Sequence, residues 1–178
     1  MRKTVAFAIA IAVLLAACYL GSPFLGFYRL QEAAKSGDQD ALETVVDFPV
    51  VRGNLKAQLN AGLMSKLQAD PKLKGNAFAA LGMMFATAVI DKLVDSYLTP
   101  QAIGMMVTRA RAPKPGGTAD SDRPPQLDRG YGYINLDRFR VTVADHGRPD
   151  MPLGFVMERR GLVGWKLIRI ELPGRLFD

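Results

Sequence analysis

Chemically reactive side chains are scarce in this chain, which has one histidine, His146, and one cysteine, Cys18. Histidine is the usual general base near neutral pH, but His146 precedes Gly147 in a predicted turn, and a solvated surface position is the simpler interpretation. One cysteine cannot form a disulfide within the chain, and these two residues supply too few ligands for a Cys/His metal site. We therefore expect no catalytic activity, no metal and no cofactor.

Two further groups that suggest chemistry have structural explanations. Asp47 stands directly before Phe48–Pro49, where a carboxylate that caps a helix contributes about 1 kcal/mol. The methionine pairs Met83–Met84 and Met105–Met106 suggest copper. Neighbouring residues on a helix point about 100° apart, so an adjacent pair cannot converge on one ion. Filling of the core is therefore the favoured interpretation of these methionines.

Four residues near the end of the chain are candidates for a binding site: Arg138, Phe139, Arg140 and Arg169. The arginines would either bind an anionic headgroup or metabolite, or form cross-strand ion pairs with Glu158 and Glu171 on a solvated sheet face. Cross-strand pairing is the favoured interpretation. Phe139 belongs to the opposite, apolar face, where a pocket for an acyl chain is the less favoured alternative to dense packing.

The first residues indicate attachment to a membrane. Met1–Lys3 is basic, Thr4–Tyr28 has no charged side chain, and Thr4–Leu20 reaches the lower limit of about 17 residues for a membrane span. The basic end predicts an N-terminus in the cytoplasm and a domain in the periplasm, anchored in the inner membrane. A cleaved signal peptide is one alternative, and the lipobox-like Leu15–Cys18 offers lipidation at Cys18 as another. The uncleaved anchor is favoured because apolar residues continue beyond Cys18.

The composition supports one globular domain and argues against a nucleic-acid partner. The chain is 49% hydrophobic, enough for a core, and its formal net charge is +6. Without Arg2 and Lys3 the domain has a formal net charge of about +4. Its cations are scattered, and no nucleic-acid-binding motif is recognisable. A mild attraction to anionic membrane lipid suits a tethered domain, and ordinary solubility explains the charge at least as well. The expected partners are membrane lipid through the N-terminal segment and an unidentified protein partner or acyl-chain ligand.

Helical signals dominate the first two thirds of the chain. Expected helices span residues 24–35, 39–46, about 49–68, 76–90 with an amphipathic extension, and 100–109. Ser22–Pro23 is a helix-start signal. In the third helix Val51, Leu55 and Leu59 begin an apolar stripe with a spacing of four. Because residues 76–90 contain no charge, we predict a central helix buried on nearly all sides.

Strand signals follow a loop. Residues 112–126 contain four prolines and two glycines and are expected to separate helices from strands. Alternation puts Phe139, Val141 and Val143 on one face, residues 146–150 form a turn, and a hairpin spans residues 153–172. The predicted fold is α+β, with an anchor or signal segment at 1–21 and one domain at 22–178, its helices packed on a C-terminal antiparallel sheet.

Several segments, in this order, resemble the bacterial domain of unknown function 2939 family. They are Ser22–Pro23, Ser36–Asp38, Val46–Arg52, Leu55–Leu59, Phe155–Arg159 and Gly164–Pro173. The resemblance covers about residues 22–173 and implies an N-terminally anchored envelope protein without an assigned activity or catalytic residue. A layer of small-residue helices on a curved sheet also resembles the nuclear transport factor 2-like folds, an analogy of shape that implies no function.

Taken together, these features predict a membrane-tethered binding or interaction module in the periplasm. A small enzyme or a lipid-binding protein, with a cone-like pocket between helices and sheet, is one alternative. A lipoprotein with a structural role in the envelope is another. An enzyme needs convergent polar groups within a cavity, and the scattered carboxylates of this chain favour the binding module.

Overall fold

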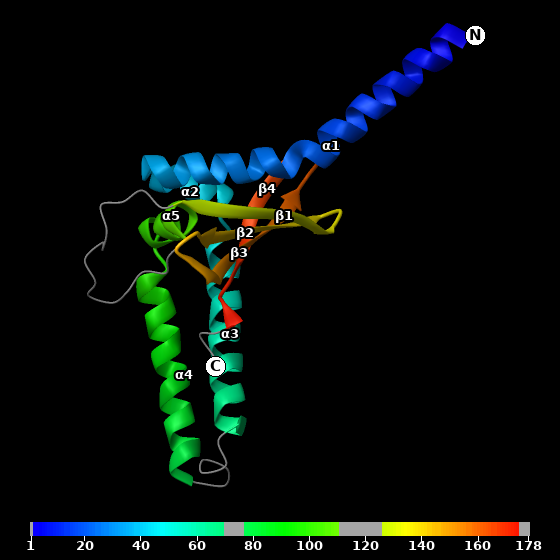
Figure 1. Ribbon diagram of the computed structural model, residues 1–178. Helices are drawn as coiled ribbons and strands as arrows, with labels where there is room; N and C mark the ends of the chain where they lie inside the picture. The colour runs from blue at the N-terminus through cyan, green and yellow to red at the C-terminus, as the bar shows by residue number, and fades with distance from the viewer. Residues whose placement is uncertain (1, 70–76, 111–125, 175–178) are drawn as a thin grey trace.

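Helices precede strands along the chain in the computed structural model, which describes residues 2–69, 77–110 and 126–174 (Figure 1). The helices are α1 (Arg2–Ser36), α2 (Gln39–Val45), α3 (Phe48–Ala69), α4 (Ala77–Tyr97) and α5 (Pro100–Arg109). The strands are β1 (Leu127–Asn135), β2 (Arg138–Asp145), β3 (Arg148–Arg160) and β4 (Gly164–Glu171). They form one antiparallel sheet in the order β1-β2-β3-β4, and this arrangement confirms the predicted α+β class. Almost all of the predicted loop at 112–126 lies outside the described residues.

α1 runs without a break from the apolar segment into the domain, although Pro23 lies inside it. The prediction that a new helix starts at Ser22–Pro23 is therefore wrong. Pro23 has no N–H to donate to the carbonyl oxygen of Tyr19, four residues earlier. The Ser22 hydroxyl donates to that oxygen instead, at 2.8 Å. The helix continues through a bend that Figure 1 shows, as is usual for a helix that contains proline.

The other predicted helix starts are present. Asp38 Oδ1 accepts a hydrogen bond from the backbone N–H of Ala41 at 3.1 Å and caps α2. Thr99 Oγ1 accepts from the N–H of Ala102 at 3.2 Å and caps α5, in which Pro100 is the first residue. These caps satisfy N–H groups that have no partner within their own helix.

β2 alternates as predicted. Phe139, Val141 and Val143 are buried on one face of the sheet, while Arg138 and Arg140 are exposed on the other. α1 packs on β3 and β4 over the buried face, and α5 packs against α1. Figure 1 shows α1 lying across one side of the sheet.

β1 was not expected, yet it pairs with β2 along its length. Gly130 and Gly132 interrupt its sequence, and glycine is depleted in strands. β3 also begins at Arg148 rather than at Leu153. The predicted turn at 146–150 is therefore too long, because prolines within β3 weaken the strand signal.

α3 covers the outer edge of β4. Asn54 Nδ2 donates to the carbonyl oxygen of Ile168 at 2.9 Å, and Gln58 Nε2 donates to that of Ile170 at 2.8 Å. Gln58 Oε1 also accepts from the N–H of Leu172 at 3.3 Å. Two side chains of one helix thus satisfy backbone groups that an open strand edge would offer to another chain.

α4 does not lie on the sheet, and the prediction of a central buried helix is wrong. α4 packs on α3 and is buried near its C-terminal end, at Val94, as is Leu98 directly after the helix. Phe85 is 71% exposed, and Val89 and Leu93 are exposed as well. Residues 76–90 contain no charged side chain, so their sequence does not show which face of the helix is in water. Composition alone therefore cannot distinguish an exposed helix from a buried one.

Candidate functional site

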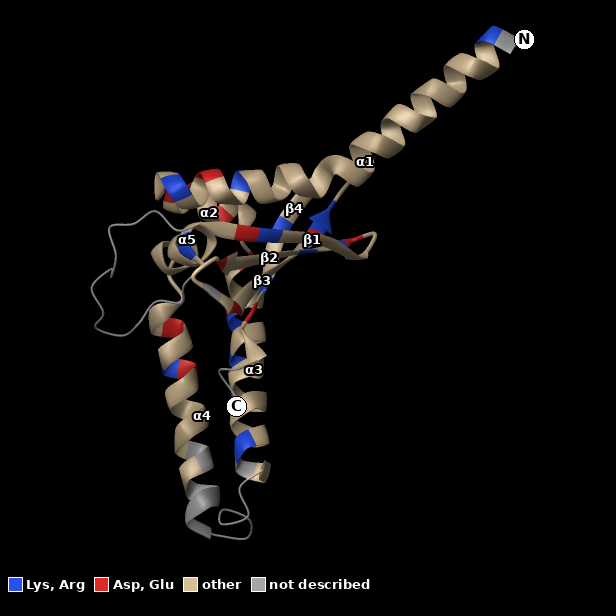
Figure 2. Ribbon diagram, in the orientation of Figure 1, with Lys and Arg blue, Asp and Glu red and all other residues tan. Residues whose placement is uncertain are grey.

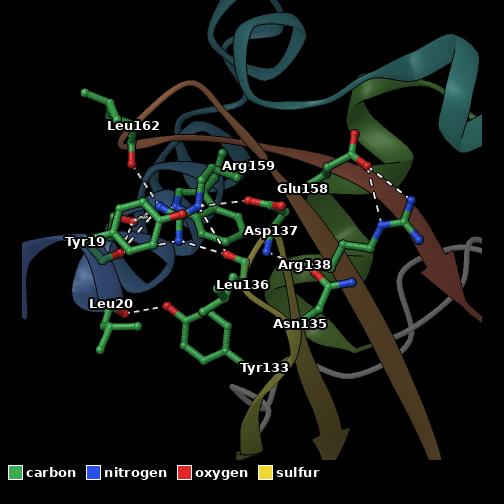
Figure 3. Close-up of polar contacts among 12 residues, drawn as sticks. Tyr19, Leu20, Tyr133, Asn135, Leu136, Asp137, Arg138, Glu158, Arg159 and Leu162 are labelled. Atoms are coloured by element: carbon green, nitrogen blue, oxygen red, sulfur yellow. Dashed lines mark hydrogen bonds and ion pairs between the residues drawn. The ribbon is translucent and has the colours of Figure 1, made fainter. Parts of the chain in front are cut away.

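Arg159, near the end of β3, holds α1 against the sheet (Figure 3). Its Nη1 lies 3.0 Å from Ser22 Oγ and 2.8 Å from the carbonyl oxygen of Leu162, and its Nη2 lies 3.0 Å from that of Leu136. Both nitrogens lie 3.4 Å from the carbonyl oxygen of Tyr19, which Pro23 leaves without its helical partner. One guanidinium group therefore joins α1 to the β1–β2 and β3–β4 turns.

Aromatic rings enclose the same guanidinium group. Its central carbon lies 3.7 Å from the ring centre of Tyr19 and 4.4 Å from that of Trp165. Trp165 Nε1 donates to Ser22 Oγ at 2.9 Å. The side chain of Arg159 is only 4% exposed, and the nearby Asp137 carboxylate, at 3.7 Å, is itself mostly exposed. Carbonyl oxygens and ring faces, which are preferred surroundings of a cation, replace the water that Arg159 loses.

Together, Arg159, Tyr19, Ser22 and Trp165 form what we call the junction cluster. The hydroxyl group of Tyr133 adds a further bond from the sheet to α1, by donating to the carbonyl oxygen of Leu20. Tyr19 and Leu20 are the last residues of the apolar segment Thr4–Leu20. The junction cluster therefore holds the domain at the end of that segment. Within the described ranges, α1 is long and apolar enough to cross a membrane, judged by length and composition.

The candidate binding arginines are paired on the exposed face of the sheet. Arg138 Nη2 lies 3.3 Å from Glu158 Oε1, and Arg140 Nε lies 2.9 Å from Glu171 Oε2, which is the cross-strand pairing favoured by the sequence. Arg169 Nη2 donates to Asn54 Oδ1 at 3.4 Å. These three cations thus already have side-chain partners. Figure 2 shows blue and red segments side by side on the strands.

Phe139 lies on the buried face and is separated from those arginines by the sheet itself. Its ring centre is 5.1 Å from that of Phe24 and 6.4 Å from that of Trp165. Neighbouring rings therefore occupy the space beside Phe139. The helix predicted at 76–90 is the one that would line an acyl-chain pocket with Phe139. Its described part, from Ala77, lies in α4, which packs on α3.

Asp47 has two structural roles beside a cleft. Its Oδ1 accepts from the N–H of Val50 at 3.4 Å, and its Oδ2 lies 3.2 Å from Arg160 Nη2. The cleft has a volume of about 450 Å³ and is lined by Asp47, Phe48, Arg52 and Lys166, among others. Arg52 Nε is buried and no described residue accepts a hydrogen bond from it, whereas Nη2 of the same side chain donates to the carbonyl oxygen of Leu98 at 3.5 Å.

The remaining predicted residues belong neither to the lining of the cleft nor to the junction cluster. His146 is exposed in the β2–β3 turn, with Nδ1 3.1 Å from Asp128 Oδ2. Cys18 is exposed on α1, one residue before Tyr19. Met106 is buried, whereas Met105 is exposed. Among the residues that the structure describes, no three His, Cys, Asp or Glu side chains are grouped to hold a metal ion.

Sequence reasoning missed Arg159, although two signals point to it. The buried positions Leu153, Phe155 and Met157 alternate toward Arg159, so a charge occupies a position on the apolar face of β3. Pro23 leaves the Tyr19 carbonyl group without a helical donor. A buried cation and an unpaired carbonyl oxygen each need a partner. Only the fold shows that they satisfy each other.

A family comparison places the chain among proteins with no assigned activity. The model of the family described as Protein of unknown function (DUF2939) matches residues 12–106, which is just over half of the 178 residues. The match begins within the apolar part of α1, ends in α5 and stops before the sheet. Comparisons with curated proteins and with solved structures gave no match. On the residues matched, this chain belongs to the DUF2939 family.

Proposed function

We propose that this protein is a single-pass membrane protein that holds a non-catalytic binding module in the periplasm. The continuity of α1 is the observation that carries the proposal. The helix extends from the apolar segment into the core, where Phe27 and Leu30 are buried, and the junction cluster fixes its bend. A cleaved signal peptide needs no such bonds to the mature domain. The basic residues at the start of the chain favour a cytoplasmic N-terminus.

The cleft beside α3 supports the binding part of the proposal. The guanidinium group of Arg52 lines the cleft and has one weak hydrogen bond, from Nη2 to the carbonyl oxygen of Leu98 at 3.5 Å. Arg52 and Lys166 are two cations in the lining of this cleft, and a carboxylate or carbonyl group of a bound molecule would pair with them. A small polar ligand that carries such an acceptor group is therefore the class we assign to the cleft.

Fractionation of cells that make the full chain tests the anchor. We expect the protein to stay with the inner membrane after carbonate extraction, and to become accessible to protease only when the outer membrane is opened. The intact mass should include the N-terminal segment. Recovery in the soluble fraction would contradict the anchor, and a mature chain that starts at a lipidated Cys18 would replace the span by a lipoprotein.

Native mass spectrometry of the full chain, released from detergent micelles, tests the cleft. We expect a bound small molecule that Arg52→Met removes. The matched control is Arg140→Met, which removes an exposed, paired arginine outside the cleft and should leave the ligand in place. A mass without ligand for the unmodified chain, or equal loss in both variants, would reject the cleft as the binding site and leave the anchor untouched.

A further inference from the structure

Large apolar side chains are exposed on two turns of the sheet. Leu136, in the β1–β2 turn, is 62% exposed. In the β3–β4 turn, Leu162 is 79% exposed and Val163 is 62% exposed. Turns of soluble domains are usually polar, and neighbouring exposed apolar side chains mark interaction sites. We call these three residues the turn patch.

Both turns lie beside the end of the apolar segment. In an antiparallel meander, the first and third turns lie at the same end of the sheet. Arg159 reaches the carbonyl oxygens of Leu136 and Leu162 as well as that of Tyr19, all within 3.4 Å (Figure 3). The turn patch is therefore held at the level of Tyr19 on α1.

The length of the apolar segment places that level at the surface of the bilayer. As a helix with a rise of about 1.5 Å per residue, Thr4–Leu20 is about 25 Å long. The hydrocarbon core of a bilayer is about 30 Å thick, so a segment that starts at the cytoplasmic surface ends near the opposite boundary. Because this segment is short, the domain is drawn close to the lipid.

We propose that the turn patch inserts into the bilayer interface, so that the domain rests on the membrane in a fixed orientation. The proposal rests on the anchor assigned above. Tyr19 and Tyr133 then lie at headgroup depth, where tyrosine is enriched in membrane proteins, and the bond from the Tyr133 hydroxyl to the Leu20 carbonyl oxygen supports this position. α3 and α4 extend from the opposite side of the sheet (Figure 1) and point away from the lipid.

Single-cysteine probes on the full chain in lipid nanodiscs test this contact. The discs contain phosphatidylcholine and phosphatidylglycerol, and Cys18→Ser first removes the natural thiol. A fluorescent label is then placed through Leu162→Cys, Leu136→Cys, Phe85→Cys or Val13→Cys. Phe85 is the matched control, because it is 71% exposed but lies on α4. Quenching is measured with aqueous iodide and with nitroxide-labelled lipid.

We expect lipid nitroxide to quench the labels at positions 162 and 136, and iodide to quench them several-fold less than the label at position 85. The label at position 13 reports on the span itself. If position 13 is in lipid while positions 162, 136 and 85 are equally open to iodide, the turn patch does not touch the bilayer and the inference fails alone. If iodide quenches the label at position 13, the N-terminal segment does not span the membrane. That result rejects both the membrane anchor and the insertion of the turn patch.

Discussion

Arg159 and Arg140 lie on neighbouring strands and differ in what surrounds their guanidinium groups. Arg140 pairs with Glu171 at the surface, where water screens the attraction and such pairs contribute about 0–1 kcal/mol. Arg159 is buried and donates to three backbone carbonyl oxygens and to Ser22 Oγ. The planar, forked guanidinium group can reach these acceptors at once, which a lysine ammonium group cannot do.

Arg159→Lys should therefore lower the free energy of unfolding of the full chain by about 2 kcal/mol, because carbonyl oxygens around it lose their donors. Urea unfolding in detergent micelles measures the change, and the single tryptophan, Trp165, reports it because it lies at the junction cluster. Arg140→Lys is the control and should cost less than about 1 kcal/mol. Equal losses in the two variants would show that Arg159 is no more than a surface cation.

Among the elements, α1 approaches β4 closely because a glycine faces Trp165. A Cβ atom on Gly26 would lie 2.6 Å from the Cβ atom of Trp165, nearer than any side-chain contact allows. Gly21, on the same helix, has no such neighbour within 4 Å. The close contact therefore requires that position 26 has no side chain, whereas position 21 has room for one.

Gly26→Ala should push α1 away from β4 and lower the free energy of unfolding by about 1–3 kcal/mol, with Trp165 fluorescence shifted toward that of an exposed indole. Gly21→Ala should leave stability unchanged or raise it by up to about 1 kcal/mol, because alanine favours the helix. The urea midpoints of the two variants measure this difference. A Gly26→Ala chain as stable as the parent, with unchanged fluorescence, would contradict the close contact.

On the scale of the whole molecule, α3 and α4 form an arm attached at one end (Figure 1). Val94 and Leu98 are buried where α4 joins the rest of the domain, and Lys56 on α3 lies 2.9 Å from Asp95. Farther along α4, Phe85 and Val89 are exposed. Stability should therefore depend on the attached end and very little on the exposed face.

Phe85→Asp should change the free energy of unfolding by no more than about 0.5 kcal/mol, as is usual for exposed positions. Val94→Asp buries a carboxylate among apolar side chains and should cost about 3 kcal/mol or more. Thermal unfolding followed by circular dichroism compares the two. If Phe85→Asp were as damaging as Val94→Asp, Phe85 would have to be packed, and the exposed arm would be the wrong description.

The sequence by itself determined the features that depend on neighbouring residues. The helix starts after Asp38 and Thr99, the alternation along β2 and the exposed positions of Arg138 and Arg140 follow from local chemistry and a period of two. The apolar N-terminal segment and the α+β class also follow, since composition and the order of the elements carry them.

Tertiary structure alone decided which distant groups satisfy one another. Arg159 contacts Tyr19 and Ser22, which lie 140 and 137 positions earlier in the chain. This contact accompanies a bend within one continuous helix at Pro23, where the sequence predicted a helix start. Placement of α4, which carries no charge before Asp91, beside α3, and of the glycine-containing β1 beside β2, likewise depends on partners elsewhere in the chain. Local sequence patterns do not reveal such long-range contacts, because burial and hydrogen bonding depend on how the whole chain packs.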